Sequence, residues 1–382
     1  MNSVLISADQ TWALWAVLLS CAALGLWAER SGAGIGSRIS GAVITMLSAF
    51  ALSNLNVIPA AAPSYEVVWE YLVPLAIPLL LVNADLRRIL TESGPMLIAF
   101  MIGACGTVLG VLLGFSVLPL GQHDWQLAAV FTATYIGGSL NYVATAKAVG
   151  LEDNSLLTTG MAADNLMMIV YFLILFSLPS IVRLQSFFHE RSGKRPAAEV
   201  IPDKNNPTGG RSNVSGMAFA LAMSLLVCAF AFELEKMTPY EGTAILIITL
   251  VSLMLATLWR SLMKQMNGAM ETGTLLMQIF FATIGASANI HTVIQAGPVL
   301  LAFAGIILLV HLLVMLCAGY FAKLSLPEIL IASNANTGGP TTALAMASAR
   351  RWHDLMVPAA LCGTLGYASG NFIGLVVGNL LK

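Results

Sequence analysis

The sequence predicts an all-α polytopic membrane protein. Of its 382 residues, 58% are hydrophobic and 10% are charged, whereas a soluble domain carries about 25% charged residues. The apolar residues form long continuous runs, not the short alternating segments of a membrane β-barrel. The formal net charge of −1 gives no basis for nucleic-acid binding. We therefore expect the lipid bilayer as the main partner and a multi-pass location in the cell inner membrane.

Twelve segments approach the length of about 20 mostly apolar residues that a spanning helix needs. In the first half they lie at 11–28, 38–58, 66–84, 94–119, 125–149 and 154–182. In the second half they lie at 214–234, 239–259, 270–289, 296–321, 326–349 and 355–381. The stretch between the halves is polar and basic and contains three prolines, which predicts a flexible cytoplasmic linker. We expect a first transmembrane repeat over 1–184, the linker over 185–213 and a second transmembrane repeat over 214–382.

The two halves resemble each other in the spacing of their landmarks. Gly137 and Gly338 are 201 residues apart, and the same offset relates Gly41 to Gly242 and Glu70 to Glu271. A shared offset predicts an internal duplication, with about six helices in each repeat. Six crossings per half would make the repeats parallel, whereas an inverted repeat needs an odd number of crossings between equivalent points. The distribution of Lys and Arg does not decide between them.

Adjacent glycines interrupt one hydrophobic segment in each half, and adjacent glycines weaken a helix. Unwound backbone at membrane depth is tolerated only where it is buried in protein or lines a cavity. Interrupted segments at matching places in two halves point to a transporter's binding site. We therefore expect both breaks to line one cavity near the bilayer midplane. The predicted substrate-binding residues are Gly137, Gly138, Asn141, Asn336, Thr337, Gly338, Gly339, Thr341 and Asn371.

Asp164 is the most informative acidic residue because it lies within a hydrophobic segment. An ionisable side chain at membrane depth costs several kcal/mol unless it is paired or hydrated, which indicates an ion or proton site. The alternative is a capping or network aspartate near the interface. Uncharged oxygens nearby suit hard cations, although they could equally form interhelical hydrogen bonds. The predicted ion-binding residues are Ser139, Asn141, Thr159, Asp164 and Asn165; the second half has no carboxylate matching Asp164.

Other residues carry weaker signals. His311 lies alone in an apolar run, which favours a core histidine over a proton relay. Glycines at 106, 110 and 114 have the spacing of close helix packing. The five cysteines are scattered singly, which favours core packing over disulfides or a metal cluster. No metalloprotease, hydrolase, Walker or dinucleotide motif is present, so we expect neither an enzyme nor a cofactor, with sodium as the candidate bound ion.

Two stretches resemble known transporter families. The Gly-Gly-x-x-Asn break at 137–141 is similar to the crossing region of sodium/bile-acid symporters, and the Asp164-Asn165 pair is similar to the acidic pair of cation/proton antiporters. The resemblance implies inverted repeats, a panel domain and a core domain of crossed, broken helices. It also implies sodium ligands at Ser139, Asn141 and Thr159. The glycine-to-Asn spacing is one residue shorter here and the Asp-Asn order is reversed, so coupling ion and direction do not carry over.

The chain as a whole, including the run from Pro78 to Arg88, resembles the YjcL-like family of bacterial multi-pass membrane proteins. These patterns predict a secondary transporter, coupled to sodium or protons, for a small organic solute. An organic anion suits the partial positive charge at the N-termini of broken helices. The alternative is a sodium/proton antiporter with Asp164 as exchange site, and a third class is a channel or intramembrane enzyme. A homodimer is left open.

Overall fold

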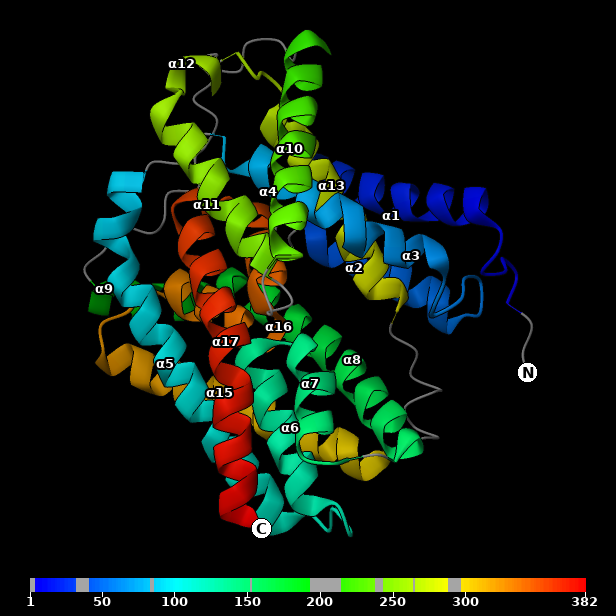
Figure 1. The fold of residues 1–382 in the computed structure, drawn as a ribbon, viewed down its shortest axis with the longest axis vertical. Helices are drawn as coiled ribbons and strands as arrows, with labels where there is room; N and C mark the ends of the chain where they lie inside the picture. Colours follow the sequence, from blue (N-terminus) through cyan, green and yellow to red (C-terminus); the bar gives the residue numbers. More distant parts are fainter. Residues whose placement is uncertain are drawn as a thin grey trace. The chain divides into compact units, whose positions relative to one another are not determined.

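The computed structural model describes residues 4–31, 41–82, 86–151, 153–192, 214–237, 243–263, 265–287 and 297–382. Within these ranges every regular element is a helix (Figure 1). Each of the twelve predicted segments coincides with one helix or with a run of consecutive helices. The described part of the chain has six stretches long and apolar enough to cross a membrane: Thr11–Glu29, Gly94–Val117, Leu156–Ser180, Val214–Glu235, Pro298–Phe321 and His353–Leu381. The protein is therefore a multi-pass helical membrane protein.

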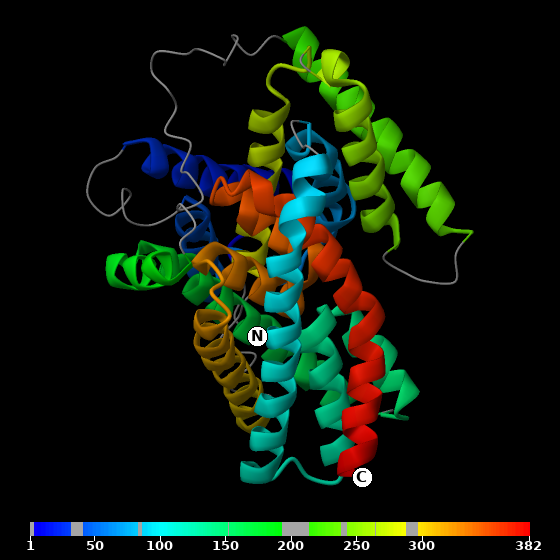
Figure 2. The same ribbon diagram turned by 90° about the vertical axis from the view of Figure 1, so that its left-hand side faces the viewer.

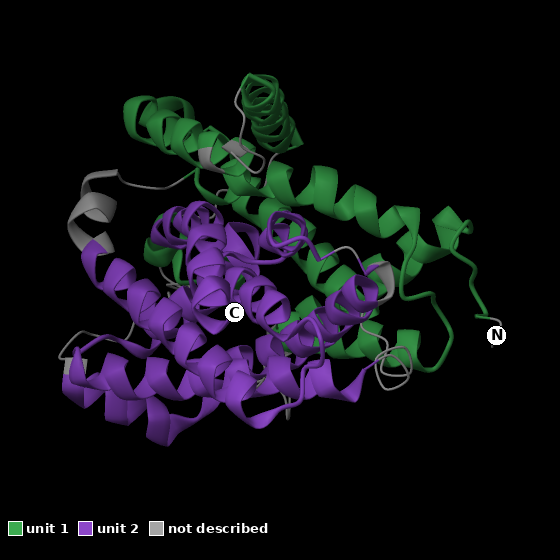
Figure 3. Ribbon diagram, turned by 60° about the horizontal axis from the view of Figure 1, so that its bottom comes forward, with its two compact units in different colours: residues 1–92, 197–288, 344–357 green, residues 93–196, 289–343, 358–382 purple. Residues whose placement is uncertain are grey.

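The helices form two compact units, each assembled from both halves of the sequence (Figure 3). Unit 1 comprises residues 1–92, 197–288 and 344–357. Unit 2 comprises residues 93–196, 289–343 and 358–382. Neither unit corresponds to one half of the sequence, because the chain contributes to each unit, leaves it and returns.

The core of unit 1 includes a cluster of buried apolar side chains, among them Leu79, Met263 and Met266, and some of its helices approach very closely. A Cβ atom at Gly285 would collide with the carbonyl of Met46, so these helices approach at backbone distance. The buried Thr45 hydroxyl donates to Gln278 Oε1 at 2.9 Å. The helices of unit 1 are α1 (Thr11–Ser31), α2 (Gly41–Asn54), α3 (Pro63–Val67), the π-helical turn η2 (Val68–Leu72), α4 (Val73–Leu80), α10 (Val214–Glu235), α11 (Thr243–Leu258), α12 (Arg260–Met263) and α13 (Ala269–Ala286).

Unit 2 contains both of the predicted helix breaks. Its first broken helix consists of α6 (Asp124–Gly137) and α7 (Leu140–Ala148), and its second is α16 (Leu326–Ala349) up to residue 343. The other helices of unit 2 are α5 (Leu86–Val117) from residue 93, α8 (Asn154–Ser177), the short η3 (Leu178–Ser180), α9 (Val182–Ser192), α15 (Pro298–Phe321) and α17 (Met356–Leu381) from residue 358.

The glycine-rich face of α5 packs closely on α15, as the sequence predicts. A Cβ atom at Gly110 would lie 2.8 Å from the backbone of Ile307, and one at Gly114 would lie 2.7 Å from the ring of Phe303. Glycine is required here because the neighbouring atoms belong to the backbone or to a buried ring. These helices therefore approach more closely than side chains would allow.

The predicted linker over 185–213 is wrong for its first residues, because α9 continues to Ser192. The ring of Phe187 stacks on Tyr320 at 4.3 Å, and the Arg191 guanidinium lies 5.4 Å from the same ring. The aromatic residues give the start of this polar stretch a face that docks against the end of α15. Residues 193–213 lie outside the described part of the chain.

Candidate functional site

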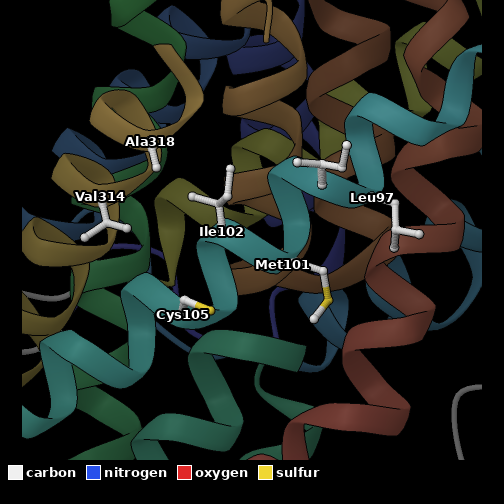
Figure 4. Close-up of a pocket in the computed structure, with 7 residues that line it drawn as sticks. Leu97, Met101, Ile102, Cys105, Val314 and Ala318 are labelled. Carbon is white, nitrogen blue, oxygen red and sulfur yellow. The ribbon is translucent and has the colours of Figure 1, made fainter. Parts of the chain in front are cut away.

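An apolar groove lies between α5 and α15 (Figure 4). Its lining residues are Leu97, Ile98, Met101, Ile102, Cys105, Val314 and Ala318. Such a groove suits a hydrocarbon chain and has few groups that could orient a polar solute. Cys105 and Cys317 are exposed, so the prediction that all five cysteines pack in the core is wrong for these two. The helix breaks are the better candidate site.

The first break lies at Gly138. Helix α6 ends at Gly137, and the Gly138 amide closes its last turn by donating to the Thr134 carbonyl at 2.6 Å. Gly138 has φ 83° and ψ 174°, a conformation essentially restricted to glycine. The chain re-enters a helix at Leu140. The second glycine of the predicted pair is thus the residue at which the helix direction changes.

The second break uses the same backbone conformation. Within α16, Gly339 has φ 79° and ψ −171°. Pro340 follows it and has no N–H group to offer the preceding turn. Gly138 and Gly339 are 201 residues apart, the offset that the sequence landmarks share. Both predicted breaks therefore occur, at equivalent positions and with nearly equal dihedral angles.

The two breaks meet inside unit 2. A Cβ atom at Gly138 would lie 3.2 Å from the amide nitrogen of Gly339 and 3.3 Å from the carbonyl carbon of Gly338. The expectation that the breaks lie together is met, but here they are in van der Waals contact and do not enclose an open cavity between these backbones. Only the absence of side chains lets the helices cross so closely.

Helix α17 covers both breaks with a face of glycines that the sequence analysis did not identify. Gly374 approaches the backbone of α6, where a Cβ atom would lie 2.6 Å from the Ala129 carbonyl. Figure 1 and Figure 2 both show α17, in red, running beside α6 and α7. These glycines are spaced three or four residues apart in the sequence, as on α5, and this spacing could have identified the face. The face consists of Gly363, Gly366, Gly370, Gly374 and Gly378.

A side-chain hydrogen bond bridges each break. Across the first, Asn141 Nδ2 donates to the Ala133 carbonyl at 3.4 Å and to the Gly366 carbonyl at 3.3 Å. Across the second, Asn334 Nδ2 donates to the Thr342 carbonyl at 3.3 Å, and the Thr342 hydroxyl donates to Asn334 Oδ1 at 2.8 Å. The bridged positions are equivalent at the offset of 201 residues. Asn141, predicted to bind both substrate and ion, therefore stabilises the break.

Asp164 lies on α8 beside the first break and is completely buried. Its Oδ2 accepts a hydrogen bond from the Ser139 hydroxyl at 3.0 Å. Its Oδ1 is buried and has no hydrogen-bond partner among the described residues. The buried Tyr135 hydroxyl lies close to this carboxylate, but the two groups do not form a well-aligned hydrogen bond. These two incompletely satisfied oxygens beside Ser139 form an arrangement that a cation would complete.

The structure separates the other predicted ion ligands from Asp164. Asn165 is exposed, and a helix turns about 100° between consecutive residues, so it leaves α8 on a different face. Thr159 is half-buried, five residues earlier on α8, and also points away from the Asp164 face. Only Ser139 of the predicted set contacts the carboxylate. Tyr135, whose side chain faces Asp164, was not among the predicted ion-binding residues. Its position three residues before the break at Gly138 could have identified it.

The predicted solute residues of the second half lie mainly on α16. Asn336 is fully buried; its amide donates to the Phe100 carbonyl at 3.1 Å, while its Oδ1 has no hydrogen-bond partner among the described residues. Thr337 is also fully buried, and Thr341 is 8% exposed. Asn371 on α17 accepts a hydrogen bond from Thr145 at 2.8 Å. The second break thus presents one buried, unsatisfied amide oxygen, as the first presents the Tyr135 hydroxyl.

Comparison with known proteins gives two matches. The family model described as "Protein of unknown function (DUF819)" matches residues 16–382. The chain is also 36% identical, over 395 aligned residues, to a protein of Bacillus subtilis (strain 168) whose name is "Uncharacterized membrane protein YjcL". This alignment covers 98% of each chain, so the similarity extends over both units and both helix breaks.

Proposed function

The chain belongs to the DUF819 family of membrane proteins, and on that premise we propose that it is a cation-coupled secondary transporter for a small organic anion. Transport would occur by alternating access in the cell inner membrane. The observation that carries the proposal is the meeting of two helix breaks next to a buried aspartate with an unsatisfied oxygen. Interrupted helices that meet at one place are the common construction of transporter binding sites.

The cation site in this proposal consists of Asp164, Ser139 and Tyr135. Asp164 supplies the charge, and the two hydroxyl groups supply neutral oxygens. A cation there would satisfy the buried Oδ1 of Asp164, which is otherwise costly to bury. Sodium or a proton could fill this role, because each neutralises one carboxylate.

The solute site in this proposal lies where helices restart after the breaks. Helix α7 begins at Leu140, and α16 resumes after Gly339. The N-terminal end of a helix carries partial positive charge, which suits a carboxylate. An anion and a cation held near one another offset each other's charge, and this supplies a physical reason for coupled transport. The contact between Gly138 and Gly339 would then represent a closed state that solute entry must separate.

The alternative is a cation/proton antiporter in which Asp164 alternates between a proton and sodium. The unsatisfied Oδ1 of Asp164 favours it, because that atom can hold either ion without any solute. The two functions differ in one requirement. A symporter binds an organic solute, and an antiporter needs only cations on the two sides.

The experiment is a thermal-shift screen of the purified protein, followed by flux measurements in proteoliposomes. Small organic anions are tested in sodium chloride and in choline chloride. For the symporter we expect at least one anion to raise the melting temperature more in sodium, because coupling between ligands is reciprocal. If only sodium and pH change the melting temperature, and sodium drives proton movement, the antiporter is correct. Solute-independent flux at channel rates would contradict both.

A further inference from the structure

His311 on α15 is completely buried and has a hydrogen-bond partner at each ring nitrogen. Its Nδ1 lies 2.9 Å from the Thr107 hydroxyl of α5, and its Nε2 lies 3.0 Å from the Ser333 hydroxyl of α16. Ser333 in turn lies 2.6 Å from the Tyr171 hydroxyl of α8. His311 is therefore a core histidine, as the sequence favoured, but its two partners lie on two other helices, and Tyr171 extends the network to a third.

The direction of each hydrogen bond follows from the proton count. The Thr107 hydroxyl donates its single proton to the Tyr135 carbonyl at 3.0 Å, so it must accept from His311 Nδ1–H. A neutral imidazole has one donor and one acceptor, so Nε2 accepts from Ser333. The Ser333 oxygen then accepts from Tyr171. This directed chain runs from Tyr171 through Ser333, His311 and Thr107 to Tyr135, and every intermediate group both donates and accepts.

The directed chain includes a residue of each broken helix. It ends at Tyr135 of α6, whose carbonyl would accept from residue 139 in a continuous helix, but α6 ends at Gly137. Thr107 satisfies this freed carbonyl, and the side chain of the same Tyr135 faces Asp164. On the other side of His311, Ser333 lies on α16, where its carbonyl accepts from the Thr337 hydroxyl at 3.0 Å. His311 thus connects the residue beside the cation site to the turn that precedes the second break.

We propose that His311 couples the two half-sites: it is a positioning residue that transmits cation binding at Asp164 and Tyr135 to α16. The inference rests on the proposed function. Every O–H and N–H donor of the directed chain is already used, so movement of the Tyr135 backbone either breaks a buried hydrogen bond or moves Ser333 with it. Breaking one is unfavourable because the separated groups stay buried. Cation occupancy therefore biases the conformation of α16, where Asn336, Thr337 and Thr341 lie.

The test measures α16 with sodium alone as the probe. In a background without the five native cysteines, Thr341→Cys introduces a thiol at the most exposed of the three solute residues on α16. Its alkylation rate with N-ethylmaleimide is compared in sodium chloride and in choline chloride. We expect the two rates to differ by about fivefold or more, the lower end of typical coupling between sites. The sodium-induced rise in melting temperature reports cation binding separately.

Three variants cut the directed chain at different links. His311→Asn places an amide near the Nδ1 position and loses Ser333, whereas His311→Gln places it near Nε2 and loses Thr107. Thr107→Val keeps the shape and removes one hydroxyl. The alkylation ratio is the rate in sodium chloride divided by the rate in choline chloride. In each variant we expect this ratio to approach one, while sodium still raises the melting temperature. If the His311 variants do not fold, Thr107→Val and Ser333→Ala provide the same comparison.

The outcomes separate the inference from the proposed function. Suppose that Asp164→Asn abolishes the sodium-induced stabilisation, so that the cation site is supported. His311 then only packs if the alkylation ratio is unchanged in folded variants that cut the directed chain, or if it is already one in the background protein. If sodium stabilises wild type and Asp164→Asn equally, or stabilises neither, Asp164 is not part of a sodium site and the inference, which needs sodium binding there, is overturned with that site. A variant with a lower melting temperature but an unchanged alkylation ratio has lost stability and has kept the response of α16 to sodium.

Discussion

Gly138 and Gly339 adopt the same backbone conformation and lie in contact, although 201 residues separate them in the chain. Their φ angles of 83° and 79° differ by less than the usual scatter within one element type. A methyl group on either glycine would be strained in its own backbone. At Gly138 it would also meet the backbone of Gly338 and Gly339, and at Gly339 it would meet the ring of Tyr367 on α17. The crossing of the two broken helices therefore depends on these two positions.

Gly138→Ala is expected to destabilise the protein by about 1–3 kcal/mol, the cost of holding a residue in a sparsely populated backbone region. Gly121→Ala is the matched control, because Gly121 also has a positive φ of 89° but a Cβ atom there would have open space. We expect a larger fall in the melting temperature for Gly138→Ala. Equal falls for the two variants would show that contact between the breaks contributes nothing.

Asp164→Asn should remove the pH dependence of sodium binding. Protons and sodium compete for one carboxylate, so the apparent sodium affinity of the wild type should weaken as pH falls. Neutral Asn keeps the shape and ends the competition. The measurement is sodium-induced thermal stabilisation across pH. Asp153→Asn, which neutralises an exposed carboxylate but keeps an oxygen for the Leu156 amide, is expected to leave the pH dependence unchanged; an unchanged dependence in folded Asp164→Asn would exclude Asp164 from the mechanism.

Asn141→Ala should lower stability by about 1–3 kcal/mol, because the carbonyls of Ala133 and Gly366 would each lose the hydrogen bond from the buried Asn141 amide. The sequence pattern predicts loss of ion-dependent uptake as well. Thermal unfolding and uptake are measured together, with Asn379→Ala at an exposed position of α17 as control. Full stability in Asn141→Ala would show that the bridge across the first break is unimportant.

Gly374→Ala and Gly305→Ala are expected to change stability in opposite directions. Alanine is favoured over glycine within a helix by about 1 kcal/mol. At Gly305 the nearest atom to a new Cβ would be the flexible end of Met167 at 3.5 Å, so the gain should be realised. At Gly374 the Cβ would lie 2.6 Å from the Ala129 carbonyl, and overpacking typically costs about 1–3 kcal/mol. Melting temperatures that rise for both would mean that α17 is not held closely on α6.

Sequence patterns predicted the helix positions and both breaks because these depend on local signals. Apolar runs set the helices, and glycine pairs mark where a helix can be interrupted. The contact of Ser139 with Asp164 was also within reach, since both residues lie close to the first break. Local signals could not find the partners of Asn141 or His311, because the Gly366 carbonyl and the Thr107 hydroxyl are more than 200 residues away. The helical turn of about 100° per residue, which is a local signal, could have separated Thr159 and Asn165 from Asp164.

The bridges across the breaks have a consequence for how the two halves are compared. An asparagine forms each bridge, but it stands after the first break, at Asn141, and before the second, at Asn334. The equivalent positions, Ala133 and Thr342, hold different residues. The same pair of positions is therefore bridged in both halves, although the donor stands on opposite sides of the two breaks. A residue-by-residue comparison of the halves scores both positions as mismatches, so the correspondence becomes visible only when positions are compared in pairs.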